Sequence, residues 1–125
     1  GFPLPGEGTA SAAMFVAHDM SHVIAGYEPT GVDEIALGAM QLGIADTDEH
    51  WVQLMGNIGV HEAGFIDKGA HLAVLARPGA VDTVAHAFDR GAHCTADFTF
   101  ADHLSMVDEP LTLVRERFGV PPRLR

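Results

Sequence analysis

The sequence predicts an all-α fold, a compact bundle of several helices, on three observations. Apolar residues recur at helical spacing along most of the chain, Gly and Pro divide it into segments of helix length, and no run of alternating apolar and polar residues exceeds about five. The chain has 125 residues, of which 47% are hydrophobic, and this is enough for one core. We therefore expect a single helical domain over residues 1–125.

The first two predicted helices are joined by a short turn. A lead-in rich in Pro and Gly precedes a helix over about residues 9–25, whose apolar residues cover more than one stripe and predict burial on most sides. The turn over residues 26–31 leads to a second helix through about residue 42. Thr30, followed three residues later by Asp33, resembles a capping box at its start.

A third helix is expected over about residues 47–66, behind the acidic cap and first-turn residues at positions 46–48. Its apolar stripe at helical spacing consists of Trp51, Leu54, Met55, Ile58 and Phe65. Glycines at positions 56, 59 and 64 weaken this helix in isolation. They would also let another helix or an apolar ligand approach its backbone closely.

Three more helices complete the prediction. One covers residues 69–76 and ends before a Pro-Gly turn, and the next covers about residues 80–97. The last has Pro110 at its first helical position and stops at Gly119. The pattern over residues 98–109 is ambiguous.

Charge and cysteine content limit the classes of function. There are 17 acidic and 7 basic residues, a net charge of −10 that argues against a nucleic-acid partner. The single cysteine, Cys94, excludes an internal disulfide framework and a zinc finger, and it suits the reducing cytoplasm. Arg115 and Arg117 would allow peripheral contact with the inner face of a membrane. The high content of Ala, Gly, Val and Asp, beside a single Lys, suggests a GC-rich bacterial gene.

The strongest candidate for chemistry is a group of His and acidic residues around the first turn. His18 and His22 are four residues apart, so their rings project from one helix face, and Asp19 flanks that face. His22 lies about 6 Å before the turn and Glu34 about 4.5 Å after it. In an antiparallel helical hairpin, Glu34 would be level with His22. The four side chains would then form the kind of site that helical bundles use for divalent metals.

Two interpretations of this group stay open from the residues alone. Imidazoles and carboxylates can hold a divalent ion, and their spacing does not select among zinc, iron and manganese. The same side chains could instead form a hydrogen-bonded core pair, because histidines often have carboxylate neighbours without a metal. An ion held by such ligands keeps open positions. It would polarise a carboxylate or phenolate and, if redox-active, bind molecular oxygen.

The same residues resemble the signature of the Coq-four family of coenzyme Q (ubiquinone) biosynthesis proteins. That signature is His-Asp-x-x-His followed by eleven residues and Glu, and here it is formed by His18, Asp19, His22 and Glu34. The segments directly after His22 and Glu34, and the ending over residues 110–121, are also similar to the family. The resemblance covers roughly residues 9–122.

The resemblance implies a mostly helical metalloprotein that acts on polyprenylated benzoquinone precursors at membranes. It implies His18, Asp19, His22 and Glu34 as ligands of one divalent ion. The implied reaction is oxidative decarboxylation, in which hydroxyl replaces the C1 carboxyl group of the ring and molecular oxygen is a co-substrate. Family members have more helix before the signature. The chain is therefore expected to match the C-terminal part of the family's domain, with earlier residues, a partner chain or a second copy completing the pocket.

Four of the other histidines and the cysteine are assigned structural roles. His50 and His61 would lie about 16 Å apart along the third helix, too far to share an ion, so surface or capping positions are expected. His86 and His93 are expected on a solvated helix face. Cys94, among small residues, is expected to be a buried apolar filler.

Small and flexible residues predict an apolar channel that leads to the metal. The glycines of the third helix would lower its wall, and four methionines would line it: Met20, Met40, Met55 and Met106. A channel of this kind would suit a hydrophobic, prenylated aromatic small molecule.

Three functions follow from these expectations. The leading hypothesis is a metal-dependent, lyase-like enzyme for oxidative decarboxylation and C1 hydroxylation of a prenylated aromatic acid. The main rival is a non-enzymatic prenyl-lipid-binding scaffold of a quinone-biosynthesis complex, with a structural metal. The third is a divergent relative that acts on a smaller aromatic substrate in secondary metabolism. A scaffold needs exposed apolar patches, whereas an enzyme needs an open metal position.

Overall fold

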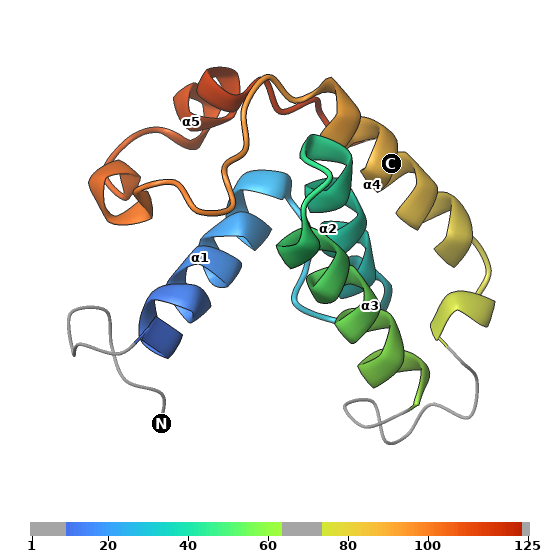
Figure 1. Cartoon of the computed structure of the whole chain (residues 1–125). Helices are drawn as coiled ribbons and strands as arrows, with labels where there is room; N and C mark the ends of the chain where they lie inside the picture. Colours follow the sequence, from blue (N-terminus) through green and yellow to red (C-terminus); the bar gives the residue numbers. More distant parts are fainter. Residues whose placement is uncertain (1–9, 64–73, 124–125) are drawn as a thin grey trace.

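The computed structural model describes residues 10–63 and 74–123, and all regular structure in these ranges is helical. The elements, drawn in Figure 1, are α1 (Ala10–Ala25), α2 (Gly31–Ile44), α3 (Asp48–Glu62), α4 (Ala80–His93) and α5 (Leu111–Phe118), with the short 3₁₀ helices η1 (Val74–Ala76) and η2 (His103–Met106). The all-α prediction is confirmed. Within these ranges no helix has both the length and the apolar character needed to cross a bilayer.

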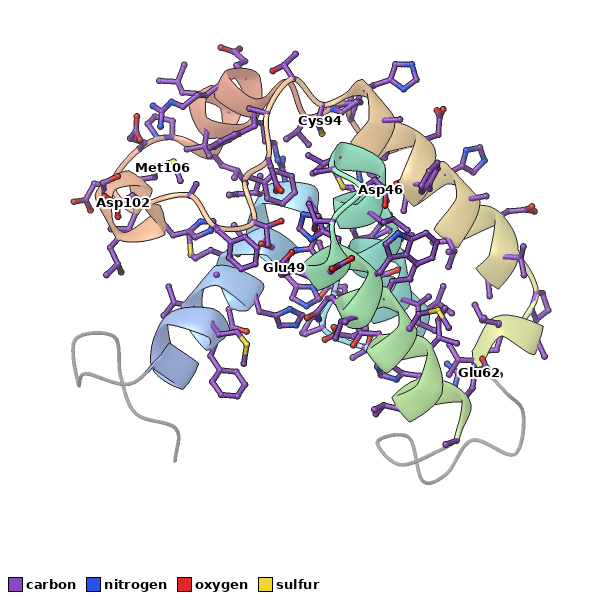
Figure 2. All side chains as sticks on the ribbon, viewed as in Figure 1. Asp46, Glu49, Glu62, Cys94, Asp102 and Met106 are labelled. Atoms are coloured by element: carbon purple, nitrogen blue, oxygen red, sulfur yellow. The ribbon has the colours of Figure 1, made fainter. Side chains whose placement is uncertain are left out.

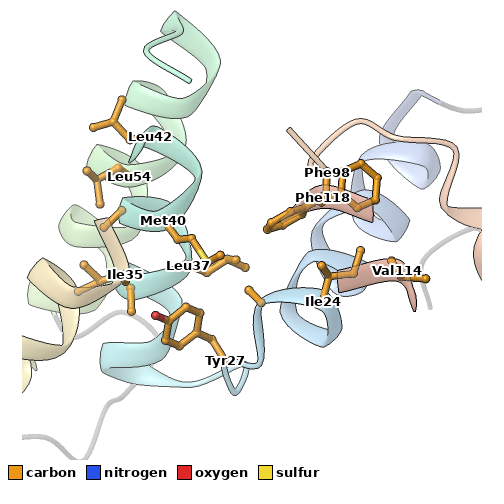
Figure 3. Packing of buried hydrophobic residues seen from close by; sticks show 14 of the residues in the cluster. Ile24, Tyr27, Ile35, Leu37, Met40, Leu42, Leu54, Phe98, Val114 and Phe118 are labelled. Atoms are coloured by element: carbon orange, nitrogen blue, oxygen red, sulfur yellow. The ribbon is translucent and has the colours of Figure 1, made fainter. Parts of the chain in front are cut away.

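Helix α2 is the centre of the molecule. Its residues 35–42 are all buried, and the helix packs against both α3 and α4 (Figure 1). The apolar core continues from Leu37 and Met40 on α2, past Tyr27, to Ile24 on α1 and Phe118 on α5 (Figure 3). One core therefore connects the α2–α3–α4 group with α1 and α5.

Helices α2 and α4 approach each other closely enough for their backbones to touch. A Cβ atom placed on Gly91 would lie 2.0 Å from the carbonyl oxygen of Met40, and one on Gly43 would lie 2.2 Å from that of Phe88. No side chain larger than hydrogen fits at either crossing point. The two glycines thus fix the distance between the central helix and α4.

The C-terminal end of α1 is held by arginines. Arg115 donates to the carbonyl oxygens of Ile24 (2.9 Å) and Val23 (3.0 Å). Arg90 on α4 donates to that of Ala25 at 3.0 Å. The last carbonyls of a helix lack partners within the helix and carry the negative end of its dipole, so guanidinium groups stabilise them.

The start of α2 differs from the predicted capping box. The Thr30 side chain makes no capping hydrogen bond. Asp33 instead accepts a hydrogen bond from the Glu28 amide and pairs with Arg123. The capping-box prediction was wrong because a residue 90 positions later in the chain occupies the Asp33 carboxylate.

Several predicted boundaries also shift. Helix α3 ends at Glu62 rather than 66, and residues 64–66 lie outside the described residues, as does most of the predicted 69–76 helix. Helix α4 ends at His93 rather than 97, because Cys94 is extended. Pro110 precedes α5 as its cap instead of standing at the first helical position.

Burial follows a different pattern from the one predicted for α1 and α3. Met14 and Val23 on α1 are exposed, so this helix is not buried on most sides. On α3, Trp51 and Met55 of the predicted stripe are exposed, while Leu54 is buried. The side of α3 that faces α2 also carries the buried residues His50 and His61.

His50, expected at the surface, is 2% exposed and is fixed by a hydrogen bond to Asp97. Its Nε2 donates to Asp97 Oδ2 at 2.7 Å, and its ring stacks on Phe100. Burial would raise the pKa of Asp97, but hydrogen bonds from His50 and Thr99 outweigh burial and lower it. This pair ties the loop after α4 to the start of α3. Cys94 in that loop, labelled in Figure 2, is half-buried. Its Sγ lies 3.5 Å from the Arg90 carbonyl oxygen.

We expect Gly91→Ala to lower the free energy of unfolding by about 1–3 kcal/mol or more, because the added methyl group would overlap the backbone of α2. Denaturant unfolding would measure the loss. Gly56→Ala is the matched control, since a Cβ there meets nothing within 4 Å. This change should be neutral or stabilise the helix by up to about 1 kcal/mol. Equal effects of the two substitutions would contradict the packing at Gly91.

We expect Asp97→Asn to lower the free energy of unfolding by about 1–3 kcal/mol at neutral pH, because His50 would lose a charged acceptor. The pKa of Asp97 is lower in the folded than in the unfolded chain, so its contribution is full above the unfolded value. The contribution is lost as the pH falls through the folded value, and the difference from wild type should shrink in acid. The exposed Asp89→Asn is the control. A difference that persists unchanged in acid would contradict the assigned role of Asp97.

Candidate metal centre

Three side chains converge where α1 meets α2. His18 and His22, on the last two turns of α1, place their Nε2 atoms 3.2 Å apart. Glu34, in the first turn of α2, places Oε2 3.3 Å from His18 Nε2 and Oε1 3.2 Å from His22 Nε2. In the described part of the chain, this is the one group of three or more His, Cys, Asp or Glu whose donor atoms all lie within 4.8 Å of one another. The convergence of His22 and Glu34 across a helical hairpin was predicted from their spacing.

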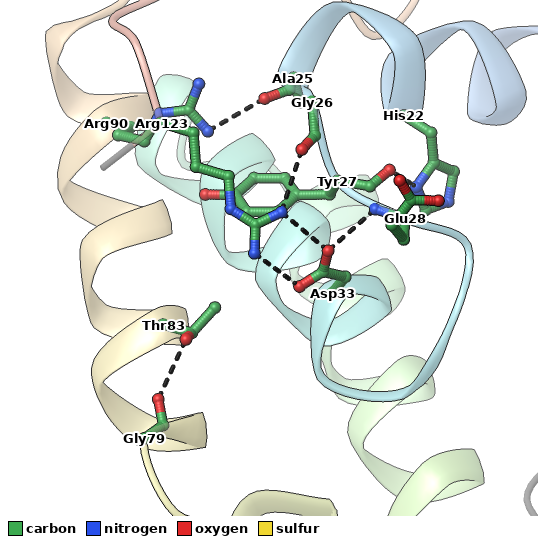
Figure 4. A network of polar contacts seen from close by, with 10 residues as sticks. All are labelled: His22, Ala25, Gly26, Tyr27, Glu28, Asp33, Gly79, Thr83, Arg90 and Arg123. Atoms are coloured by element: carbon green, nitrogen blue, oxygen red, sulfur yellow. Dashed lines mark hydrogen bonds and ion pairs between the residues drawn. The ribbon is translucent and has the colours of Figure 1, made fainter. Parts of the chain in front are cut away.

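The protonation of His22 follows from its hydrogen bond. Nδ1 lies 2.9 Å from the backbone carbonyl oxygen of Tyr27 (Figure 4). A carbonyl oxygen only accepts, so Nδ1 carries the proton, and in the neutral ring Nε2 is left with a lone pair. In the neutral ring that lone pair lies toward Glu34 and His18, whereas in the protonated ring Nε2 donates to Glu34 Oε1 at 3.2 Å. A cation between these three groups would satisfy all of them.

Charge within the group is strongly coupled. Burial would raise the pKa of Glu34, but hydrogen bonds from His18 and His22 outweigh burial and lower it to about 2. Burial would lower the pKa of His22, but the hydrogen bond and charge of Glu34 outweigh burial and raise it. Glu34 is therefore ionised throughout the neutral range. A proton and a metal ion would compete for His22 Nε2.

The ends of the two helices favour this distribution of charge. Glu34 lies in the first turn of α2, where the dipole of the helix stabilises a carboxylate. His22 lies in the last turn of α1, where the dipole stabilises a cation. Gly26, with a φ of 79°, makes the left-handed turn that reverses the chain between them. The backbone carbonyl of Glu34 also accepts a hydrogen bond from Asn57 on α3.

Asp19, the fourth predicted ligand, is not part of the converging group. Its side chain is exposed and borders an open pocket of about 520 Å³ beside His22. Its negative charge contributes to the raised pKa of His22. The structure thus brings together three of the four predicted ligands and leaves Asp19 at the edge of the group.

The predicted glycine-walled channel is not formed at α3. Gly56 and Gly59 are exposed, with nothing within 4 Å of a Cβ atom, and Met55 is 57% exposed. Gly64 lies outside the described residues. Met40 is fully buried in the core rather than lining a channel. The prediction was wrong here because the glycines lie on the side of α3 that faces away from α2.

The other histidines divide between surface and interior. His86 and His93 are exposed on α4, which confirms the predicted solvated face. His61 is buried, contrary to its predicted surface or capping position. Sequence reasoning missed the contacts around the site that come from Asn57, Asp33 and the Tyr27 carbonyl. Of these, only the position of Asp33 beside Glu34 was visible as a local signal.

Comparison with known proteins adds no relative. No protein-family model, curated protein or solved structure matches the chain. The resemblance of His18, Asp19, His22 and Glu34 to the Coq-four signature therefore stays a prediction from those residues. The function has to be inferred from the chemistry of the donor set.

We expect His22→Ala and Glu34→Gln each to lower the affinity for zinc, manganese or iron(II) by more than the roughly 10- to 100-fold that loss of an outer-shell contact costs. Each removes one direct donor from the group. Competition titration against a chelating dye would measure the affinities, and circular dichroism would check helicity. His86→Ala, which changes an exposed histidine on α4, is the control. Stoichiometric metal in both site variants would show that the ligand assignment is wrong.

Proposed function

We propose that the chain is a metal-dependent enzyme that oxidatively decarboxylates a hydrophobic aromatic acid, with chemistry like that of the Coq-four family. The observation that supports this most strongly is the convergence of His18 Nε2, His22 Nε2 and a Glu34 carboxylate, with His22 held as a lone-pair donor. Three protein donors leave open positions on a five- or six-coordinate ion. The metal is zinc, iron or manganese, and Asp19 is the fourth ligand that the signature suggests.

The residues of the site suit an anionic substrate despite the acidity of the chain. Two neutral imidazoles and one carboxylate would leave a divalent ion with a net charge of about +1, whereas Asp19 as a fourth ligand would neutralise it. A bound ion would supply Lewis acidity toward a substrate carboxylate or phenolate and, if iron or manganese, a redox partner for oxygen. Glu34 would stay ionised and hold its charge beside the two imidazoles.

The overall reaction requires molecular oxygen and an external reductant besides the aromatic acid. The C1–carboxyl bond breaks and carbon dioxide leaves, while a new C1–O bond takes one atom of molecular oxygen. The second oxygen atom leaves as water and consumes two electrons and two protons from an external reductant. The glycines of α3 face solvent and line no channel, so they do not select a substrate with a prenyl chain. The proposed substrate class is therefore a hydrophobic aromatic acid, either prenylated or smaller.

The second candidate function is a lipid-binding or protein-binding scaffold. It is favoured by large apolar side chains that are exposed on the two helices next to the site: Met14, Phe15 and Val23 on α1, and Trp51, Val52 and Met55 on α3. Exposed apolar groups of this kind mark interaction surfaces on many proteins. In this function the ion would only tie α1 to α2.

Turnover separates the two functions. We expect the wild-type protein, loaded with iron or manganese, to release carbon dioxide from a prenylated hydroxybenzoate under oxygen with ascorbate as reductant. Glu34→Gln should nearly abolish this release while the fold is kept, because the substitution removes the ligand charge of the converging group and nearly preserves shape. His86→Ala should retain full release. No release from the wild type with iron, manganese or zinc, across prenylated and smaller aromatic acids, would favour the scaffold.

A further inference from the structure

A single peptide group lies between a carboxylate and the candidate metal ligand His22. The carbonyl oxygen of Tyr27 accepts the His22 Nδ1 proton at 2.9 Å. The amide of Glu28, at the other end of the same peptide bond, donates to Asp33 Oδ2 at 2.9 Å. Figure 4 shows the three groups in line, from Asp33 through the Tyr27–Glu28 peptide to His22.

The Asp33 carboxylate is itself held in place. Arg123 donates to both of its oxygens, at 2.8 Å and 3.0 Å, and to the carbonyl of Gly26 at 3.0 Å. The Arg123 guanidinium also lies over the ring of Tyr27, 4.6 Å from its centre, and Arg90 lies 5.2 Å from the same ring. Tyr27 is 4% exposed. The Tyr27–Glu28 peptide, which accepts from His22, is therefore held by three contacts. They are made by the Tyr27 ring, the Glu28 amide and the Gly26 carbonyl.

This arrangement has an electronic consequence as well as a geometric one. An amide that donates to a carboxylate is polarised, so its carbonyl oxygen becomes a stronger acceptor. A stronger acceptor at Nδ1 favours the tautomer with the proton on Nδ1 and makes Nε2 a better donor to a metal. Metal-ligating histidines commonly have a carboxylate or carbonyl in this position. Here a carboxylate and a carbonyl act in series.

We propose that Asp33, held by Arg123, is a positioning residue that sets the tautomer and orientation of His22 through the Tyr27–Glu28 peptide. The consequence for metal affinity rests on the proposed metal function, but the effect on the tautomer does not. A purely structural Asp33 would only stabilise the turn between α1 and α2. In that case its loss would lower stability and leave the tautomer of His22 unchanged.

The first test uses the metal-free protein. Two-bond ¹H–¹⁵N spectra of the His22 imidazole, recorded at a pH where the ring is neutral, report which nitrogen carries the proton. We expect the Nδ1–H form in the wild type, a clear gain of the Nε2–H form in Asp33→Ala, and smaller gains in Asp33→Asn and Arg123→Gln. Asn keeps an acceptor oxygen for the Glu28 amide, so this variant protects the test against a loss of folding. Asp89→Asn is the charge-matched control and should resemble the wild type.

The second test is zinc affinity for the same set of proteins. Asp33→Ala should bind zinc roughly 10- to 100-fold more weakly than the wild type, with Asp33→Asn between them and Asp89→Asn unchanged. An unchanged tautomer in folded Asp33→Ala or Asp33→Asn would overturn the positioning role. A tautomer that responds in a protein that binds no zinc, manganese or iron(II) would support the positioning role and refute the proposed function. The two failures are thus distinguishable.

Discussion

The hydrogen bonds between arginines and the C-terminal carbonyls of α1 are the interactions on which the rest of the structure depends. From Met14 to the end of α1, the buried residues are Ser21, His22, Ile24 and Ala25, so apolar packing alone holds little of this part of the helix. Arg90, Arg115 and Arg123 come from α4, α5 and the segment after α5, and together they donate to four successive carbonyls, from Val23 to Gly26. These bonds satisfy groups that a buried helix end would otherwise leave unpaired. They also join α4, α5 and the segment after α5 to the end of the helix that carries His22.

The candidate metal centre uses the same helix end for a second purpose. The carbonyl end of α1 and the amide end of α2 meet at one turn, and their dipoles favour a cation beside His22 and an anion at Glu34. Asp33 and Glu34 are adjacent in the sequence but face different partners, since Asp33 pairs with Arg123 and Glu34 with the two histidines. The first turn of α2 thus supplies a candidate metal ligand, Glu34, and also Asp33, which holds the peptide that accepts from His22.

The helices and the His–Glu hairpin could be predicted because their signals are local. Apolar spacing, the turn at residues 26–31 and the offsets of His22 and Glu34 from it all act within about 20 residues. The errors arose where distant partners decide. Arg123 takes the Asp33 side chain that would complete a capping box, and Asp97 accounts for a buried His50 that looked like a surface residue. In the sequence Arg115 is interpreted only as part of a small basic end, because the backbone carbonyls that it binds have no side-chain signature.

The rigidity of the two halves of the site differs, and this has a consequence for metal binding. Glu34 stands on α2, which is packed backbone to backbone against α4 at Gly43 and Gly91. His18 stands on the more exposed part of α1, one turn before the arginine-held end. An ion shared by His18 and Glu34 would therefore connect a loosely packed helix to the most tightly packed one. Since such an ion binds the folded chain and not the unfolded one, its affinity would add to folding stability. The apolar side chains that α1 exposes would then be presented on a fixed helix, whether they meet a substrate or a partner.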